Sequence, residues 1–90
     1  MGTVTVFTID EMSFVSAMQD AKRKLEGSED EILLDFSGVL RIDSAGLRAM
    51  AELAQIAEEK AVRVAVQGVG ISVYKTLKLM RLPRVFWFER

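Results

Sequence analysis

The sequence predicts an α/β fold, in which a four-stranded and mostly parallel sheet packs with three or more helices in βαβαβαβ order. Two observations support this fold. Apolar residues that recur at every second position alternate along the chain with apolar residues that recur every three or four positions, which is the pattern of repeated strand and helix units. The 90 residues are 50% hydrophobic, enough for one packed core but not for two. We therefore expect residues 1–90 to form a single domain.

The first expected unit is a strand followed by an amphipathic helix. Residues 4–9 are rich in β-branched side chains, which favours a strand. Thr8 or Asp10 can cap the next helix, with Glu11 placed after Thr8 as in a capping box. Gly27 is expected to end this helix in a left-handed conformation. Its buried face is marked by apolar side chains at helical spacing: Phe14, Met18, Ala21 and Leu25.

Two further units complete the predicted sheet. Residues 31–35 form a strand around an unbroken apolar triplet, residues 36–43 a loop pivoting on Gly38, and residues 44–60 the longest helix. Residues 62–67 alternate like a strand, and Ser72 is placed to cap a short helix that cannot continue through Pro83. Residues 85–88 are expected to form the last strand. Sites are expected where loops leave the carboxyl ends of the strands, at Asp35 and in residues 41–46 and 68–70.

Composition favours binding over catalysis. The chain has no cysteine and no histidine, which excludes disulfides, thiol nucleophiles and imidazole bases. We expect no enzyme activity, no catalytic residue, no metal site and no cofactor. No apolar run is long enough to span a membrane, and no secretory signal is recognisable, so a cytoplasmic location is expected. The net charge of −1 and the lack of a nucleic-acid-binding motif argue against a nucleic-acid partner.

The most informative segment lies at the predicted start of the longest helix. Asp43 and Ser44 both belong to the residue types preferred as helix caps. The same helix end is a candidate contact surface, because its unpaired N–H groups and the helix dipole favour an anion. The spacing alone favours the capping role of these residues over a contact surface.

Two stretches of sequence resemble the STAS family, the domain shared by bacterial anti-sigma factor antagonists and the cytoplasmic tails of sulfate transporters. They are Asp-Phe-Ser-Gly-Val at residues 35–39 and Ile-Asp-Ser-Ala-Gly-Leu at residues 42–47, supported by residues 66–69 and 77–83. The resemblance implies a STAS-like domain and a non-enzymatic role in binding another protein. It also indicates that the first strand of the usual N-terminal hairpin is missing, which leaves a sheet edge open.

The resemblance leaves two functions open. Anti-sigma factor antagonists typically carry Asp-Ser-Ser-Gly in this loop, and a partner kinase phosphorylates the second serine, whose position is Ala45 here. An alanine cannot accept a phosphate, so no switch is expected at that position. Phosphorylation of Ser44 remains a minor alternative, because a cap side chain turned toward the backbone is a poor kinase substrate.

The second branch is the STAS subunit of Mla-type phospholipid ABC transporters. That subunit carries Asp-Thr-Gly-Gly in the corresponding loop, with a hydroxyl at the position of Ser44 and none at that of Ala45. The resemblance then implies an accessory role in lipid transport, in which the protein binds the ATPase subunit of the transporter. The expected partner is therefore an anti-sigma factor kinase or an ABC ATPase, and a homodimer stays open.

The expected binding surface is the loop and helix start at residues 43–47 with its flanks. Asp43 and Ser44 would set the helix start, and Leu47 or Met50 would supply apolar contacts at the rim. The full set of expected partner-binding residues is Asp43, Ser44, Ala45, Gly46, Leu47, Val39, Arg41, Arg48 and Met50.

Overall fold

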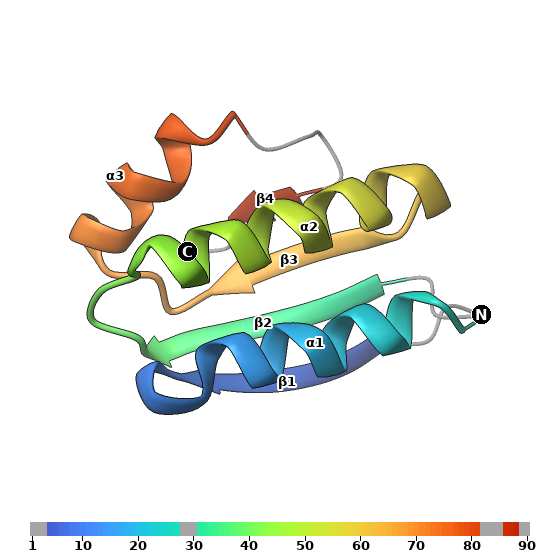
Figure 1. The fold of residues 1–90 in the computed structure, drawn as a ribbon, viewed down its shortest axis with the longest axis horizontal. Coiled ribbons are helices and arrows are strands. Elements are labelled where there is room, and N and C mark those ends of the chain that lie inside the picture. The colour runs from blue at the N-terminus through green and yellow to red at the C-terminus, as the bar shows by residue number, and fades with distance from the viewer. Residues whose placement is uncertain (1–3, 28–30, 82–85, 89–90) are drawn as a thin grey trace.

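The computed structural model describes residues 4–27, 31–81 and 86–88. Strands and helices alternate in the predicted βαβαβαβ order, with one 3₁₀ turn, η1, before the first α-helix (Figure 1). The elements are β1 (Val4–Asp10), η1 (Glu11–Ser13), α1 (Phe14–Leu25), β2 (Glu31–Gly38), α2 (Ser44–Lys60), β3 (Arg63–Gln67), α3 (Ile71–Leu79) and β4 (Phe86–Phe88). The predicted fold class is confirmed.

The four described strands form one sheet in the order β1-β2-β3-β4. Each neighbouring pair is parallel, so this sheet is more regular than the mostly parallel one predicted. Each crossover between adjacent strands carries a helix, and β1 lies at one edge of the sheet.

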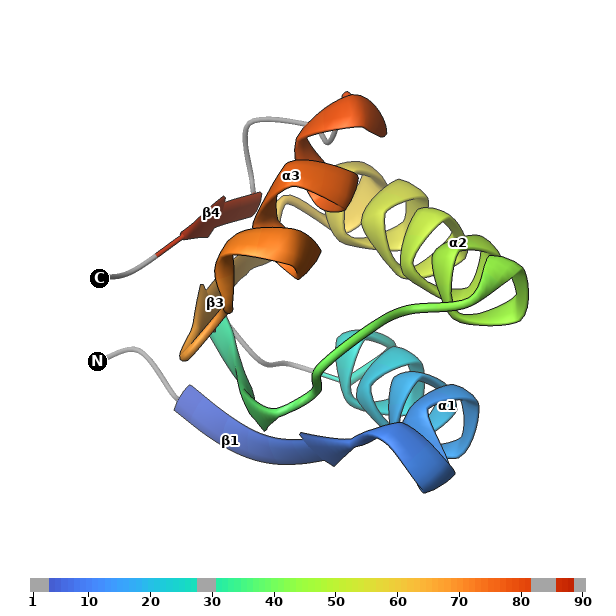
Figure 2. The same ribbon diagram turned by 90° about the vertical axis from the view of Figure 1, so that its left-hand side faces the viewer.

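The helices cover one face of the sheet (Figure 2). The core lies between them and the strand side chains that point to that face. Phe14 of α1 packs edge to face on Phe36 of β2, with ring centroids 5.5 Å apart. The largest fully buried side chains are Phe36, Ile9, Met18, Leu25, Ile32, Leu34, Met50, Leu53, Leu77, Val64 and Val66.

The second strand is longer than predicted. β2 continues to Gly38, which pairs with Asp10 past an irregularity in the β1 register, and the loop is therefore only residues 39–43. Tertiary packing explains the difference. Phe36 is fully buried on the helical face, and β1 supplies hydrogen-bonding partners beyond the apolar triplet.

Of the two caps predicted before the first helix, the structure selects Asp10, which caps η1 by accepting from the N–H groups of Met12 and Ser13. Two other helix ends differ from the prediction. Gly27 lies two residues past the end of α1, and its φ is not positive. α3 begins at Ile71 with Gly70 as its N-cap, one residue before Ser72. The predicted stop at Pro83 and the start of the last strand at residue 85 lie outside the described residues.

Candidate functional site

The start of α2 is fixed by Asp43. The backbone of Asp43 is extended, and its Oδ1 accepts a hydrogen bond of 2.8 Å from the Gly46 N–H. Its carbonyl oxygen accepts the first helical bond, 2.9 Å from the Leu47 nitrogen. An N-cap of this kind stabilises a helix by about 1 kcal/mol. Of the two caps that the sequence allowed, the structure therefore selects Asp43.

Ser44 is consequently free of the capping role. It is the first residue of α2 and is exposed, and so is Ala45. No hydrogen bond holds the Ser44 hydroxyl within the described part of the chain. The premise that this side chain turns toward the backbone is therefore wrong, because Asp43 already occupies the cap. Ser44 presents its hydroxyl at the surface.

Gly46 is required by close packing rather than by its backbone conformation. A Cβ at this position would lie 2.8 Å from Ile42 Cγ2 and 3.2 Å from Phe14 Cδ1. Gly46 is buried where the first turn of α2 passes against α1. It supports the surface from below and is not itself available to a partner.

Glu11 holds the loop that leads into α2, a role that the sequence did not reveal. Its Oε1 accepts hydrogen bonds from two consecutive backbone N–H groups, Leu40 at 2.9 Å and Arg41 at 2.8 Å. The sequence signal was the acidic residue three positions after Thr8, which indicated a local capping box. The carboxylate instead bridges to a loop about thirty residues further along the chain.

The expected flanking residues divide into exposed and buried groups. Arg41 and Arg48 are exposed, and Leu47 is partly buried. Val39 and Met50 are only 3% and 0% exposed, so their proposed direct contact with a partner is corrected. Val39 lies in the core because the turn after β2 directs it inward, with its N–H bonded to the Phe36 carbonyl at 2.9 Å. Met50 faces inward on α2, one helical turn past the buried Gly46.

Leu40, and not the predicted Val39, is the exposed apolar residue of this loop. Its side chain is 77% exposed, directly before Arg41. The sequence offered no signal for this choice, since two apolar residues stand side by side and only the turn geometry decides which faces outward.

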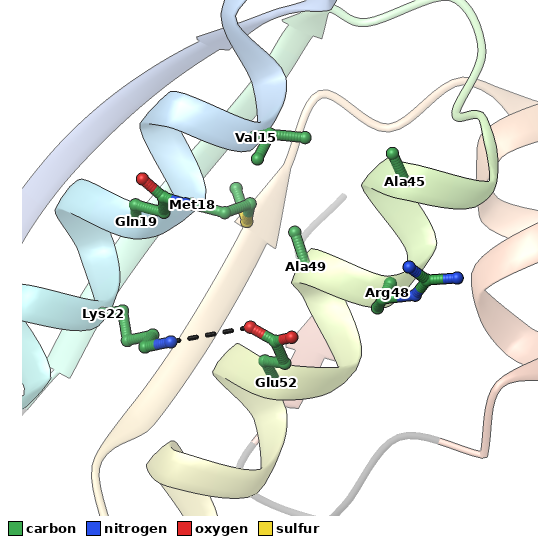
Figure 3. A pocket seen from close by; sticks show the side chains of 8 residues that line it. All are labelled: Val15, Met18, Gln19, Lys22, Ala45, Arg48, Ala49 and Glu52. Carbon is green, nitrogen blue, oxygen red and sulfur yellow. Dashed lines mark ion pairs between the residues drawn. The ribbon is translucent and has the colours of Figure 1, made fainter.

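A shallow groove of about 230 Å³ separates α1 from α2 beside this surface (Figure 3). Ala45 and Ala49 line its α2 side, and Val15 lines its α1 side. Lys22 and Glu52 point toward one another across it, with Nζ and Oε2 3.5 Å apart (Figure 3). Because both side chains are partly exposed, this pair contributes at most about 1 kcal/mol. The groove extends the exposed surface of residues 44 and 45.

Asp35 and the loop after β3 meet at the same edge of the sheet, as predicted. Asp35 Oδ1 accepts from the Ser37 hydroxyl at 2.6 Å and from the Ser37 N–H at 3.0 Å. These two donors, the hydroxyl first, hold the pKa of the Asp35 carboxyl below its ordinary value. Gly68 has a φ of 72° and lies so close to Ser37 that no side chain fits there. Together these residues fix the ends of β2 and β3.

The described residues contain no group of three or more side chains suited to holding a metal ion. Among the same residues, no helix has both the length and the apolar character needed to cross a membrane.

Comparison with known proteins agrees with this architecture. Residues 7–86 match the family model described as "Mlab, STAS domain", whereas no curated protein matches the chain by sequence. A substituted form of RsbS from Moorella thermoacetica has a similar fold, with a TM-score of 0.75 and 18% identity over 100% of this chain and 85% of that one. A protein from Thermotoga maritima described as a candidate anti-sigma factor antagonist gives a TM-score of 0.73 at 18% identity, over 94% of this chain and 77% of that one.

The fold and the capped, exposed helix start define a small α/β domain with a parallel sheet covered on one face. The family match spans most of that domain, and the chain belongs to the STAS domain family. The resemblance seen in the sequence is confirmed.

Proposed function

We propose that this STAS domain is a non-enzymatic, regulatory protein-binding module of the anti-sigma factor antagonist type, and that the start of α2 is its working surface. The observation that carries the proposal is that this helix start is exposed while hydrogen bonds hold its backbone in place. Ser44 and Ala45 are exposed, while Asp43 and Glu11 hold the backbone beneath and before them. A surface held in one conformation loses little entropy when a partner binds.

The chemistry of the surface favours an acidic partner with an apolar contact residue. Arg41 and Arg48 are exposed and carry positive charge, and the N-terminal end of α2 adds the positive end of its dipole. Leu40, 77% exposed, supplies an apolar side chain next to these charges. The combination matches the usual pairing of an apolar contact with complementary charge at an interface.

Binding is proposed to proceed without phosphorylation at residue 45, because Ala45 has no hydroxyl. The neighbouring Ser44 is exposed and is the remaining acceptor in this loop. Incubation with the cognate kinase and ATP, followed by intact-mass measurement, is expected to show no added phosphate. A stoichiometric phosphate adduct on Ser44 would contradict this proposal. It would indicate a phosphorylation switch at Ser44, one residue before the usual position.

Substitution of Ser44 tests the surface itself. Ser44→Asp adds a negative charge to the cationic surface and is expected to weaken partner binding about tenfold, measured by titration calorimetry with the partner. An acidic residue in the first turn suits the helix dipole, so the variant is expected to fold normally. Ser16→Asp, at an exposed position on α1, is the matched control. Equal affinities for both variants would show that the interface lies elsewhere.

The competing proposal is an accessory subunit of a phospholipid-transporting ABC ATPase. Two observations favour it: the family model carries the description Mlab, and Ala45 offers no phosphate acceptor. Affinity capture from the native lysate separates the two. Recovery of a GHKL-type kinase supports the antagonist, recovery of a transporter ATPase supports the accessory subunit, and loss of either protein in Ser44→Asp ties it to this surface.

A further inference from the structure

The second face of the sheet carries no helix within the described residues (Figure 2). Tyr74 of α3 packs edge to face on Phe88 of β4, with centroids 5.0 Å apart. Phe88 aligns in register with Val66 and Leu34, both fully buried on the side of α1 and α2. α3 therefore lies on that same side, and no helix among the described residues covers the opposite face, called the open face below.

Three rows of side chains cross the open face, as the strand register shows. The middle row is apolar and ends in two exposed side chains, Val6 at 57% and Trp87 at 44%. Polar and charged side chains dominate the rows on either side. The rows are Val4, Glu31 and Arg63; then Val6, Leu33, Ala65 and Trp87; then Thr8, Asp35 and Gln67. The Arg63 guanidinium lies 4.0 Å from the centroid of the Trp87 ring.

We propose that this open face binds a second copy of the chain, sheet against sheet, about a two-fold axis parallel to the strands. Such an axis places β1 opposite β4 of the second copy and β2 opposite its β3. Val6 then faces Trp87 of the second copy. Leu33, which is partly buried, lies opposite the strand that carries Ala65, and Ala65 is itself covered within its own chain at 0% exposure. An aligned packing of two sheets is one of the two common arrangements, and a two-fold axis makes the contact between Val6 and Trp87 occur twice.

Charge complementarity selects this arrangement. With the axis parallel to the strands, Glu31 of each copy faces Arg63 of the other, and Asp35 faces Gln67. With an axis perpendicular to the strands, Glu31 would instead face Asp35 of the second copy, which places like charges together. Of these two arrangements, only the first surrounds the apolar row with matched polar pairs, in the manner of the polar rim of an interface.

The expected dimer is a weak one. Ordinary strand spacing and rise give the four-stranded patch a projected area of roughly 300 Å². A standard interface buries about 800 Å² on each partner. The dimer should therefore dissociate on dilution. Because the helices lie on the other side of the sheet, this contact leaves the start of α2 open and does not depend on the function proposed above.

Sedimentation velocity of the purified chain from about 1 μM to about 1 mM tests the proposal across the range of weak association. We expect one species at low concentration and a species of two chains at high concentration. Glu31→Arg and Arg63→Glu are each expected to weaken the dimer about tenfold by facing like charges. The double variant is expected to restore it. Glu59→Arg, the same change at an exposed position on α2, should leave it unchanged.

Val6→Lys provides a second test that does not depend on the charged row. Val6 is exposed on the edge strand, so this change leaves the core intact while placing a charge at one end of the apolar row, opposite Trp87 of the second copy. We expect it to abolish the dimer, with circular dichroism confirming the native fold. A single-chain mass at every concentration would overturn the proposal, as would a dimer that tolerates Val6→Lys or a double charge variant no stronger than the single ones.

Discussion

The Glu11 carboxylate accepts a hydrogen bond from the Leu40 N–H at 2.9 Å, and the same oxygen also accepts from the next N–H along the chain. This contact ties the turn after β1 to the loop that leads into α2. The position of the candidate surface is therefore set by the first strand as well as by the helix that carries it. Leu40 is held through its backbone N–H, while its side chain is exposed.

Removal of the Glu11 carboxylate is expected to loosen this loop. Glu11→Ala should lower the free energy of unfolding by about 1 kcal/mol, since the two freed N–H groups are near the surface and can bind water. Glu11→Gln retains one acceptor oxygen and should cost less. Hydrogen exchange followed by NMR should show faster exchange of the Leu40 and Arg41 amides in Glu11→Ala. Glu26→Ala, at an exposed position after α1, is the control, and unchanged exchange would contradict the bridge.

The two candidate caps of α2 are expected to differ in their contribution to stability. Asp43→Ala removes the acceptor of the Gly46 N–H and should lower the free energy of unfolding by about 1 kcal/mol. Ser44→Ala removes no hydrogen bond and introduces a better helix former, so its effect should be near zero or slightly stabilising. Urea denaturation of both variants measures the difference. A larger loss of stability in Ser44→Ala than in Asp43→Ala would show that Ser44, and not Asp43, caps the helix.

The fold followed from the sequence where local patterns decide it. The bounds of α2 were predicted at Ser44 and Lys60 because a cap residue precedes a long run of helix formers. The end of β2 was not predicted, because the burial of Phe36 depends on the ring of Phe14 and on the neighbouring strand. Periodicity within residues 31–35 holds no information about either contact.

The location of the candidate site could be predicted, but the direction of its side chains could not. The motif around Asp43 indicated the loop, and the structure places this loop at the predicted edge of the sheet. Val39 and Leu40 were distinguished only by the turn that buries one and exposes the other. Glu11 was missed because a long-range hydrogen bond leaves no local pattern.

Gly46→Ala is expected to destabilise the domain despite the better helix propensity of alanine. That propensity favours the variant by about 1 kcal/mol. The new Cβ would lie 2.8 Å from Ile42 Cγ2 and 3.2 Å from the buried Phe14 ring, and overpacking of this kind costs about 1 to 3 kcal/mol. The net effect should be a lower thermal midpoint, measured by circular dichroism. Ala51→Gly, at an exposed position on α2, reports the propensity alone, and a raised midpoint in Gly46→Ala would show that the ring moves freely.

Asp35 is expected to titrate below its ordinary pKa of 3.8, because the Ser37 hydroxyl and then the Ser37 N–H stabilise its carboxylate. A depressed pKa in the folded state means that the stabilisation is fully present above the pKa of the unfolded chain. It is lost as the pH falls through the folded pKa. Ser37→Ala removes the first donor and keeps the second, so the pKa of Asp35 should rise toward 3.8 and less stability should be lost on acidification.

An NMR titration that follows the Asp35 carboxyl carbon measures this shift directly, and acid unfolding of the same samples measures its effect on stability. Ser16→Ala on the exposed side of α1 controls for the loss of a hydroxyl elsewhere. If the Asp35 midpoint does not move in Ser37→Ala, the 2.6 Å contact between the two side chains is not what stabilises the carboxylate. The backbone N–H of Ser37 would then be the main cause, since it is the other donor to the same oxygen.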